Sequence, residues 1–144
     1  MSGRVQVIAL LLFVALTTCV SKPEYPSPPV RGGSVVVKTA GMKAGEPVFY
    51  TVKIDGVGVS FFVLKLDGTI RSYLDACMKC YPHKKGYRVD GFYLECRYCG
   101  VRYPLDNLDQ GVGSCYPIPV NGKLNGNEYI ISLSELKGAV KYFK

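Results

Sequence analysis

The residues most able to do chemistry are four cysteines with the spacing Cys77-x2-Cys80-x15-Cys96-x2-Cys99. Each Cys-x-x-Cys pair can turn two sulfur atoms toward one point, and two such pairs can supply four thiolates to a soft metal or an iron–sulfur cluster. We therefore predict a metal centre held by Cys77, Cys80, Cys96 and Cys99. The spacing does not distinguish an iron–sulfur cluster from zinc, mononuclear iron or copper. Two disulfides, or one redox-active pair, are the alternatives.

Two further residues near this motif are candidates for the site. Cys115 follows a glycine-rich segment at residues 111–114, where the backbone can approach a cluster closely. Four roles are open for Cys115: a fifth sulfur near the metal, a ligand that replaces one of the other four cysteines, a disulfide partner, or a buried core residue. His83, the only histidine, is a ligand, a hydrogen-bond donor to a ligand sulfur, or a surface residue. Covalent c-type haem attachment is not supported, because Tyr81 rather than histidine follows Cys80.

The N-terminus has the features of an export signal. Arg4 precedes an unbroken apolar run at residues 7–16, and small polar residues follow it. The run is shorter than the roughly 20 apolar residues that a membrane-spanning helix needs. We predict that residues 1–18 are a signal peptide and that Cys19, in the lipoprotein-box sequence Leu16-Thr17-Thr18-Cys19, is lipidated. Ordinary cleavage and an uncleaved signal anchor are the alternatives.

Residues 19–33 are rich in proline, which disfavours both helices and central strands. We predict that they form a lipid-anchored or free linker ahead of one domain at residues 34–144. A lipid anchor, a stiff spacer and a domain together predict an exported protein that is anchored on the extracytoplasmic side of a membrane.

The chain has 18 basic and 11 acidic residues and a formal net charge of +7. For an exported protein, this positive charge fits anionic lipid headgroups or an acidic electron-transfer partner. We do not expect nucleic acid as a partner. A basic surface that is merely solvated is the alternative.

The domain is predicted to be mainly β. Two dipeptides, Asp55-Gly56 and Asp67-Gly68, are typical hairpin turns between runs of β-branched and aromatic residues. Strands are predicted at residues 34–38, 47–54, 57–66, 69–73, 86–89, 92–95, 101–103, 118–120 and 128–132. We expect the cysteines to lie in loops between strands of the second half.

Only the C-terminus has a helical pattern. Ser132 and Glu135 suit a capping box. Four apolar residues fall on one helical face: Leu133, Leu136, Val140 and Phe143. We therefore predict a small β sandwich or barrel with metal-binding loops, closed by one C-terminal helix.

The cysteine segment is rich in cations and tyrosines. A four-thiolate site carries negative charge, so nearby cations stabilise it and help thiols to deprotonate; the alternative is that these cations are solvated. The cations are Lys79, Lys84, Lys85, Arg88, Arg97 and Arg102. We expect the tyrosines to pack around the site, because the chain has no tryptophan to supply bulk: Tyr73, Tyr81, Tyr87, Tyr93, Tyr98 and Tyr103.

Four segments within about residues 57–137 resemble the FtrD-like family: Asp75-Ala76-Cys77-x2-Cys80, Lys85-Gly86-Tyr87, Cys96-Arg97-x-Cys99-Gly100-x-Arg102-Tyr103 and Gly113-x-Cys115-x-Pro117-Ile118-Pro119. These are membrane-associated domains described as iron–sulfur proteins and linked to iron uptake. The resemblance implies a cluster held by Cys77, Cys80, Cys96 and Cys99, with Cys115 in the same signature, and electron transfer beside a membrane permease. The sequence departs from longer members in lacking a multi-span membrane portion, so a free-standing lipoprotein with another partner is the alternative.

A weaker similarity is to Rieske domains, which are small β folds that present a [2Fe–2S] centre on two loops. Their second cluster-binding box is similar to Cys96-x2-Cys99-Gly100 and the later Pro117-Ile118-Pro119-Val120. Rieske sites have two histidines on one iron, and Cys80 and Cys99 take the matching positions here. The similarity implies a Rieske-like fold with a lower reduction potential, because thiolates donate more charge than imidazoles.

These observations predict an exported electron carrier that exchanges single electrons with a membrane partner in iron uptake or respiration. We predict an electron carrier more readily than a stand-alone enzyme, because no serine–histidine–aspartate set or phosphate loop is evident. A zinc-stapled binding module is one alternative. A thiol–disulfide redox protein that uses Cys77 with Cys80, or Cys96 with Cys99, is another, although no thioredoxin-like βαβ pattern surrounds either pair.

Overall fold

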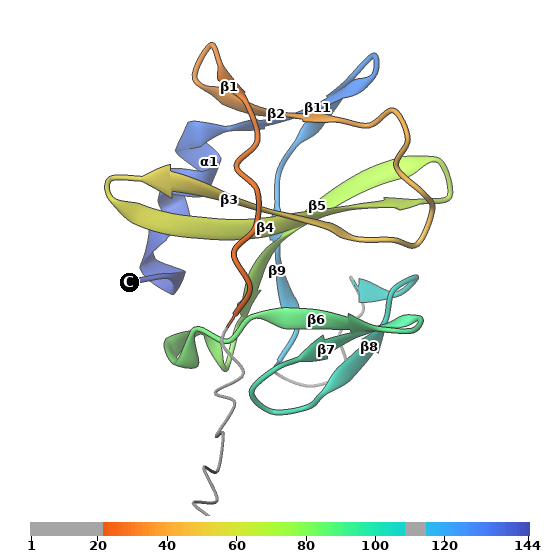
Figure 1. Cartoon of the computed structure of the whole chain (residues 1–144), viewed down its shortest axis with the longest axis vertical. Helices are drawn as coiled ribbons and strands as arrows, with labels where there is room; N and C mark the ends of the chain where they lie inside the picture. Colours follow the sequence, from red (N-terminus) through yellow and green to blue (C-terminus); the bar gives the residue numbers. More distant parts are fainter. Residues whose placement is uncertain (1–21, 109–114) are drawn as a thin grey trace, which may run out of the picture.

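The computed structural model describes residues 22–108 and 115–144. This part of the chain forms three antiparallel sheets and a short C-terminal helix (Figure 1). The first sheet has the order β1-β2-β11-β10, with strands β1 (Val30–Arg31), β2 (Ser34–Lys38), β10 (Lys123–Asn125) and β11 (Glu128–Ser132). The second has the order β3-β4-β5-β9, with strands β3 (Val48–Ile54), β4 (Val57–Leu66), β5 (Thr69–Cys77) and β9 (Pro117–Val120). The third has the order β6-β7-β8, with strands β6 (Tyr87–Asp90), β7 (Tyr93–Cys96) and β8 (Arg102–Pro104).

The second sheet is the middle layer, and both faces of its strand β4 are buried. Successive residues of a strand point to opposite faces. Phe61 lies in one core cluster with Val35 of β2, whereas Phe62 lies in a second cluster with Tyr87 and Leu94 of the third sheet. This double burial explains the long apolar run in β4, which lacks the alternation of a strand with one wet face.

Both predicted Asp-Gly hairpins are present. Asp55 and Gly56 join β3 to β4, and Asp67 and Gly68 join β4 to β5. Their φ angles are 49° and 80° in the first turn and 46° and 76° in the second. Positive φ at both central residues is the type I′ geometry, whose twist matches that of the flanking strands.

The predicted mainly β fold with one C-terminal helix is confirmed, with two differences in the strands. Strands β1 and β10 were not predicted. The strand predicted at residues 69–73 continues to Cys77, because β5 also pairs with β9. Cys77 and Cys96 therefore end strands rather than lie in loops.

The C-terminal helix α1 (Leu133–Gly138) is shorter than the predicted helical face, and the 3-10 turn η3 (Val140–Tyr142) follows it. Half of the predicted capping box forms: the Glu135 amide donates to Ser132 Oγ at 3.2 Å. The Glu135 carboxylate instead accepts hydrogen bonds from the backbone amide and the side-chain amide of Asn121.

The proline-rich segment lies against the domain, which corrects the expectation of a spacer. We call residues 22–29 the strap. The Pro26 carbonyl accepts a hydrogen bond from the Thr51 amide at 3.1 Å, and Tyr25 stacks on Phe49 with 4.9 Å between ring centroids. Strand β1 follows the strap directly. Within the described residues, no helix has the length and apolarity needed to cross a membrane.

The N-cap gives a first prediction. Replacing the cap by Ser132→Ala removes the acceptor for the Glu135 amide, so we expect a loss of about 1 kcal/mol in the free energy of unfolding. Urea unfolding measures this loss. The Ser132→Asp variant keeps a capping oxygen and should retain most of the stability; equal losses in both variants would contradict the capping role.

Candidate metal centre

Five cysteines come together where the second and third sheets meet. Cys77 ends β5 and Cys80 opens the 3-10 turn η1 (Tyr81–His83). Cys96 ends β7, with Cys99 in the turn that follows it. Cys115 lies just before β9, which pairs with β5 at the level of Cys77 and Pro117. The end of β5 with the turn after it, the β7–β8 turn and the segment before β9 thus supply all five sulfurs.

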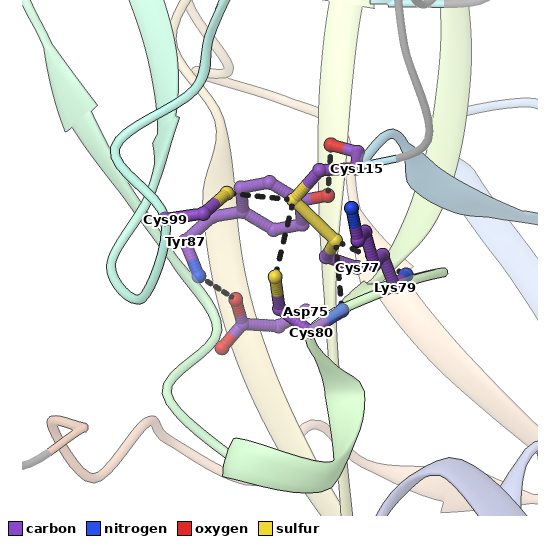
Figure 2. The surroundings of a disulfide bond; sticks show 7 residues. All are labelled: Asp75, Cys77, Lys79, Cys80, Tyr87, Cys99 and Cys115. Atoms are coloured by element: carbon purple, nitrogen blue, oxygen red, sulfur yellow. Dashed lines mark hydrogen bonds between the residues drawn. A yellow bond between two sulfur atoms is a disulfide. The ribbon is translucent and has the colours of Figure 1, made fainter.

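Four of these sulfurs form a compact buried group. The Sγ atoms of Cys77, Cys80, Cys96 and Cys115 all lie within 4.8 Å of one another. Cys99 is exposed, and its Sγ lies 3.2 Å from Cys115 Sγ. Figure 2 shows Cys80 and Cys99 both directed toward Cys115. The structure therefore brings together all the cysteines expected at the site, with Cys115 more deeply buried than Cys99.

Cys77 and Cys115 are joined by a disulfide, while Cys80, Cys96 and Cys99 are free thiols. Neither Cys-x-x-Cys pair forms the disulfide, so the bond differs from the pairs considered in the thiol–disulfide alternative. A metal ligand must be a thiolate. Ligation by Cys77 or Cys115 therefore requires the reduced form of the protein.

The local backbone suits ligation by cysteine. The amides of Lys79 and Cys80 donate hydrogen bonds to Cys77 Sγ at 3.4 and 3.2 Å. In the second pair, burial raises the pKa of Cys96, and hydrogen bonds from the amides of Cys99 and Tyr98 partly offset that rise. Such amides offset the negative charge of thiolates. The chemistry of the donor set therefore fits a thiolate-bound metal or cluster.

The three free thiols differ in acidity. Burial raises the pKa of Cys80 to about 12. Burial also raises the pKa of Cys96, even against its backbone hydrogen bonds. At Cys99, burial raises the pKa, but hydrogen bonds from the Val101 amide and from the neighbouring Cys96 and Cys80 outweigh it, so the pKa lies below its ordinary value. Cys99 is therefore the most acidic of the three.

Asp75 is a buried carboxylate two residues before Cys77. Its Oδ1 accepts a hydrogen bond from the Tyr87 amide at 2.6 Å, and its Oδ2 lies 2.7 Å from the Lys22 ammonium of the strap. Burial raises the pKa of Asp75, although Lys22 and the Tyr87 amide act in the opposite direction. Gly86, with φ of 65°, leaves room for this carboxylate.

Several cations of the cysteine segment already have partners. Arg88 pairs with Glu95 at 2.6 Å and Arg102 with Asp90 at 2.7 Å. Arg97 Nε donates to the Tyr87 carbonyl at 2.9 Å. In contrast, Lys84 and Lys85 line a cavity of about 160 Å³ whose walls include Lys22, Asp75, Cys77, Cys80 and Cys96. Three lysines thus line the cavity that the cysteines share with Asp75.

The remaining candidates are placed as follows. His83 is exposed and stacks on Tyr98, with 3.5 Å between ring centroids, and lies outside the compact sulfur group. Three of the six tyrosines predicted to pack around the site, Tyr73, Tyr87 and Tyr103, are buried in the same core cluster as the cysteines. Tyr81 instead packs against the other core cluster, and Tyr93 and Tyr98 are exposed. The predicted lipidation site, Cys19, lies outside the described residues, as do residues 111–114.

Sequence reasoning missed the contribution of Lys22. Its pairing with Asp75 joins residues 53 positions apart, and no local pattern encodes such a contact. The one available signal was Asp75 itself, because an acidic residue within an apolar strand needs a buried partner.

A family model described as "Membrane iron-sulfur containing protein FtrD-like" matches residues 26–143 and confirms the stronger resemblance. Among curated proteins, none matches the sequence significantly. Among solved structures, the ferredoxin of carbazole 1,9a-dioxygenase from Nocardioides aromaticivorans IC177 aligns with a TM-score of 0.43 and 16% identity, over 74% of this chain and 98% of its own.

The sulfur geometry predicts an order of thiol reactivity. In metal-free protein purified in air, we expect maleimide to label exposed, acidic Cys99 first and Cys80 and Cys96 only on unfolding. Cys77 and Cys115 should react only after reduction. Mass spectrometry of the proteolytic peptides shows which cysteines carry the maleimide label. Labelling of Cys77 before reduction, or of Cys80 before Cys99, would contradict the structure.

The Asp75 contact gives a prediction for Gly86. A Cβ at Gly86 would lie 2.5 Å from Asp75 Oδ1, whereas one at Gly126, which also has positive φ, would meet nothing within 4 Å. We expect Gly86→Ala to lower the free energy of unfolding by about 1–3 kcal/mol more than Gly126→Ala. Both variants carry the cost of placing alanine at a positive φ, so the difference between their free energies of unfolding, measured with urea, reports the contact with Asp75. Equal losses of stability would show that the Asp75 carboxylate can move away at no cost.

Proposed function

The chain belongs to the FtrD-like family of membrane iron–sulfur proteins, and from this premise we propose that it is an exported, lipid-anchored electron carrier. The observation that carries the proposal is the group of four buried cysteine sulfurs, all within 4.8 Å of one another. An iron–sulfur cluster bound there would supply one-electron oxidation and reduction. Buried thiolates would hold such a group away from bulk water, and the amides of Lys79 and Cys80 that donate to Cys77 would offset its negative charge.

Cys77, Cys80 and Cys96 are three ligands in this proposal. They belong both to the set that the sequence motif suggests and to the compact group in the structure. Cys99 and Cys115 compete for the fourth position: Cys99 completes the second Cys-x-x-Cys pair, whereas Cys115 is buried beside the other three.

The proposed partner is a membrane protein, either a permease of an iron-uptake system or a respiratory component. Lipidation of Cys19 would hold the domain on the extracytoplasmic surface, where such a partner is accessible.

Metal analysis of anaerobically purified full-length protein tests the proposed function. We expect iron and acid-labile sulfide, with visible charge-transfer bands that dithionite bleaches. One zinc per chain and no visible absorption would replace the proposal with the zinc-stapled binding module.

Serine variants then identify the ligands. We expect Cys80→Ser and Cys96→Ser to remove most of the iron, because Cys80 and Cys96 are ligands whether the fourth ligand is Cys99 or Cys115. Only one of Cys99→Ser and Cys115→Ser should do the same, and that one marks the fourth ligand. Full iron content in either Cys80→Ser or Cys96→Ser would contradict the proposed site. Circular dichroism of each variant controls for unfolding.

A further inference from the structure

The strap brings the N-terminal end of the domain to the cysteines. Lys22, the first described residue, pairs with Asp75, which is two residues before Cys77. From there the strap runs along the second sheet to β1 in the first sheet, at the opposite end of the molecule from β6, β7 and β8 (Figure 1). The chain thus enters the domain beside the metal centre and not at the far end.

The strap leaves almost no chain to act as a spacer. Cys19 precedes Lys22 by three residues, and three fully extended residues span at most about 11 Å. An uncleaved anchor gives a similar limit, because its apolar run ends at residue 16, and six residues span at most about 22 Å. With either form of attachment, the cysteine end of the domain must stay close to the lipid surface.

The surface at this end suits contact with lipid. Lys84 and Lys85 line the cavity beside the cysteines, and Tyr98 and Met78 are 52% and 38% exposed. Lysines near a membrane surface attract anionic headgroups, and tyrosine rings favour the interface between headgroups and acyl chains. Each of these exposed apolar residues lies inside a Cys-x-x-Cys pair, so they mark the end that carries the metal centre.

We propose that the metal-binding end of this domain docks on the lipid bilayer itself, with Lys84, Lys85, Met78 and Tyr98 at the contact. This inference rests on the membrane attachment in the proposed function and adds an orientation to it. Electrons would then enter or leave at the plane of the membrane, and the partner would be reached by lateral diffusion and not across a flexible stalk.

Tryptophan fluorescence tests this orientation cleanly, because the chain contains no tryptophan. The Tyr98→Trp variant places a probe at the cysteine end, and Leu124→Trp places a matched exposed probe in β10 of the first sheet, at the other end. Each full-length protein, with its native leader, is reconstituted in vesicles of phosphatidylcholine and phosphatidylglycerol. The emission of each variant is compared between vesicles with and without brominated acyl chains. A bound cluster quenches the emission equally in both, so its effect cancels in the ratio.

We expect brominated lipid to reduce the emission of Tyr98→Trp by about twofold, as for a ring at the headgroup–acyl boundary, and to leave Leu124→Trp unchanged. Inserting ten glycine and serine residues between Ser21 and Lys22 keeps every strap contact but lengthens the tether. If the short tether holds the contact, this insertion should restore most of the Tyr98→Trp emission.

The outcomes separate the inference from the function on which it rests. Protein that floats with vesicles and contains a reducible cluster, but shows no quenching or equal quenching of the two probes, would overturn the orientation and leave the carrier function standing. Protein that does not float with vesicles would overturn the membrane attachment and the orientation together, while its iron content still decides the carrier function.

Discussion

A carboxylate buried in a protein interior must be compensated by nearby donors or cations, and Asp75 imposes this requirement at the centre of the structure. Its partners come from two other segments: the Tyr87 amide at the start of β6 and the Lys22 ammonium of the strap. Because Tyr87 also pairs with Cys96 across β6 and β7, the same contact fixes the hairpin that carries Cys96 against the end of β5 that carries Cys77. The position of the strap and the position of the sulfurs therefore depend on one buried charge.

Local physics made much of the fold predictable. Positive φ at Asp55-Gly56 and Asp67-Gly68 is a property of those dipeptides, so both hairpin turns and strand β4 between them could be placed from the sequence. The N-cap at Ser132 could be predicted for the same reason, because its hydrogen-bond partner, the Glu135 amide, is only three residues away. The three short strands of the third sheet were also predicted, each displaced by one residue. Strands β1 and β10 of the first sheet were missed, because segments of two and three residues exist as strands only through their tertiary pairing.

The arrangement of the site depended on contacts that no local pattern specifies. The pairing of β5 with β9 is irregular between Tyr73 and Cys77, and such irregularities re-aim side chains. This pairing brings Cys115 beside Cys77, although the two are 38 residues apart. The strap was misjudged for the same reason: a proline-rich composition excludes helix, but it does not prevent docking on a sheet through Tyr25 and Lys22.

The same five sulfurs support two chemical states that exclude each other. In the disulfide state, Cys77 and Cys115 carry no thiolate, and burial keeps Cys80 protonated at neutral pH. Conversion to a metal-binding state requires two electrons to break the disulfide and the release of protons from the buried thiols. Assembly of the centre is therefore coupled to both the redox potential and the pH of the compartment.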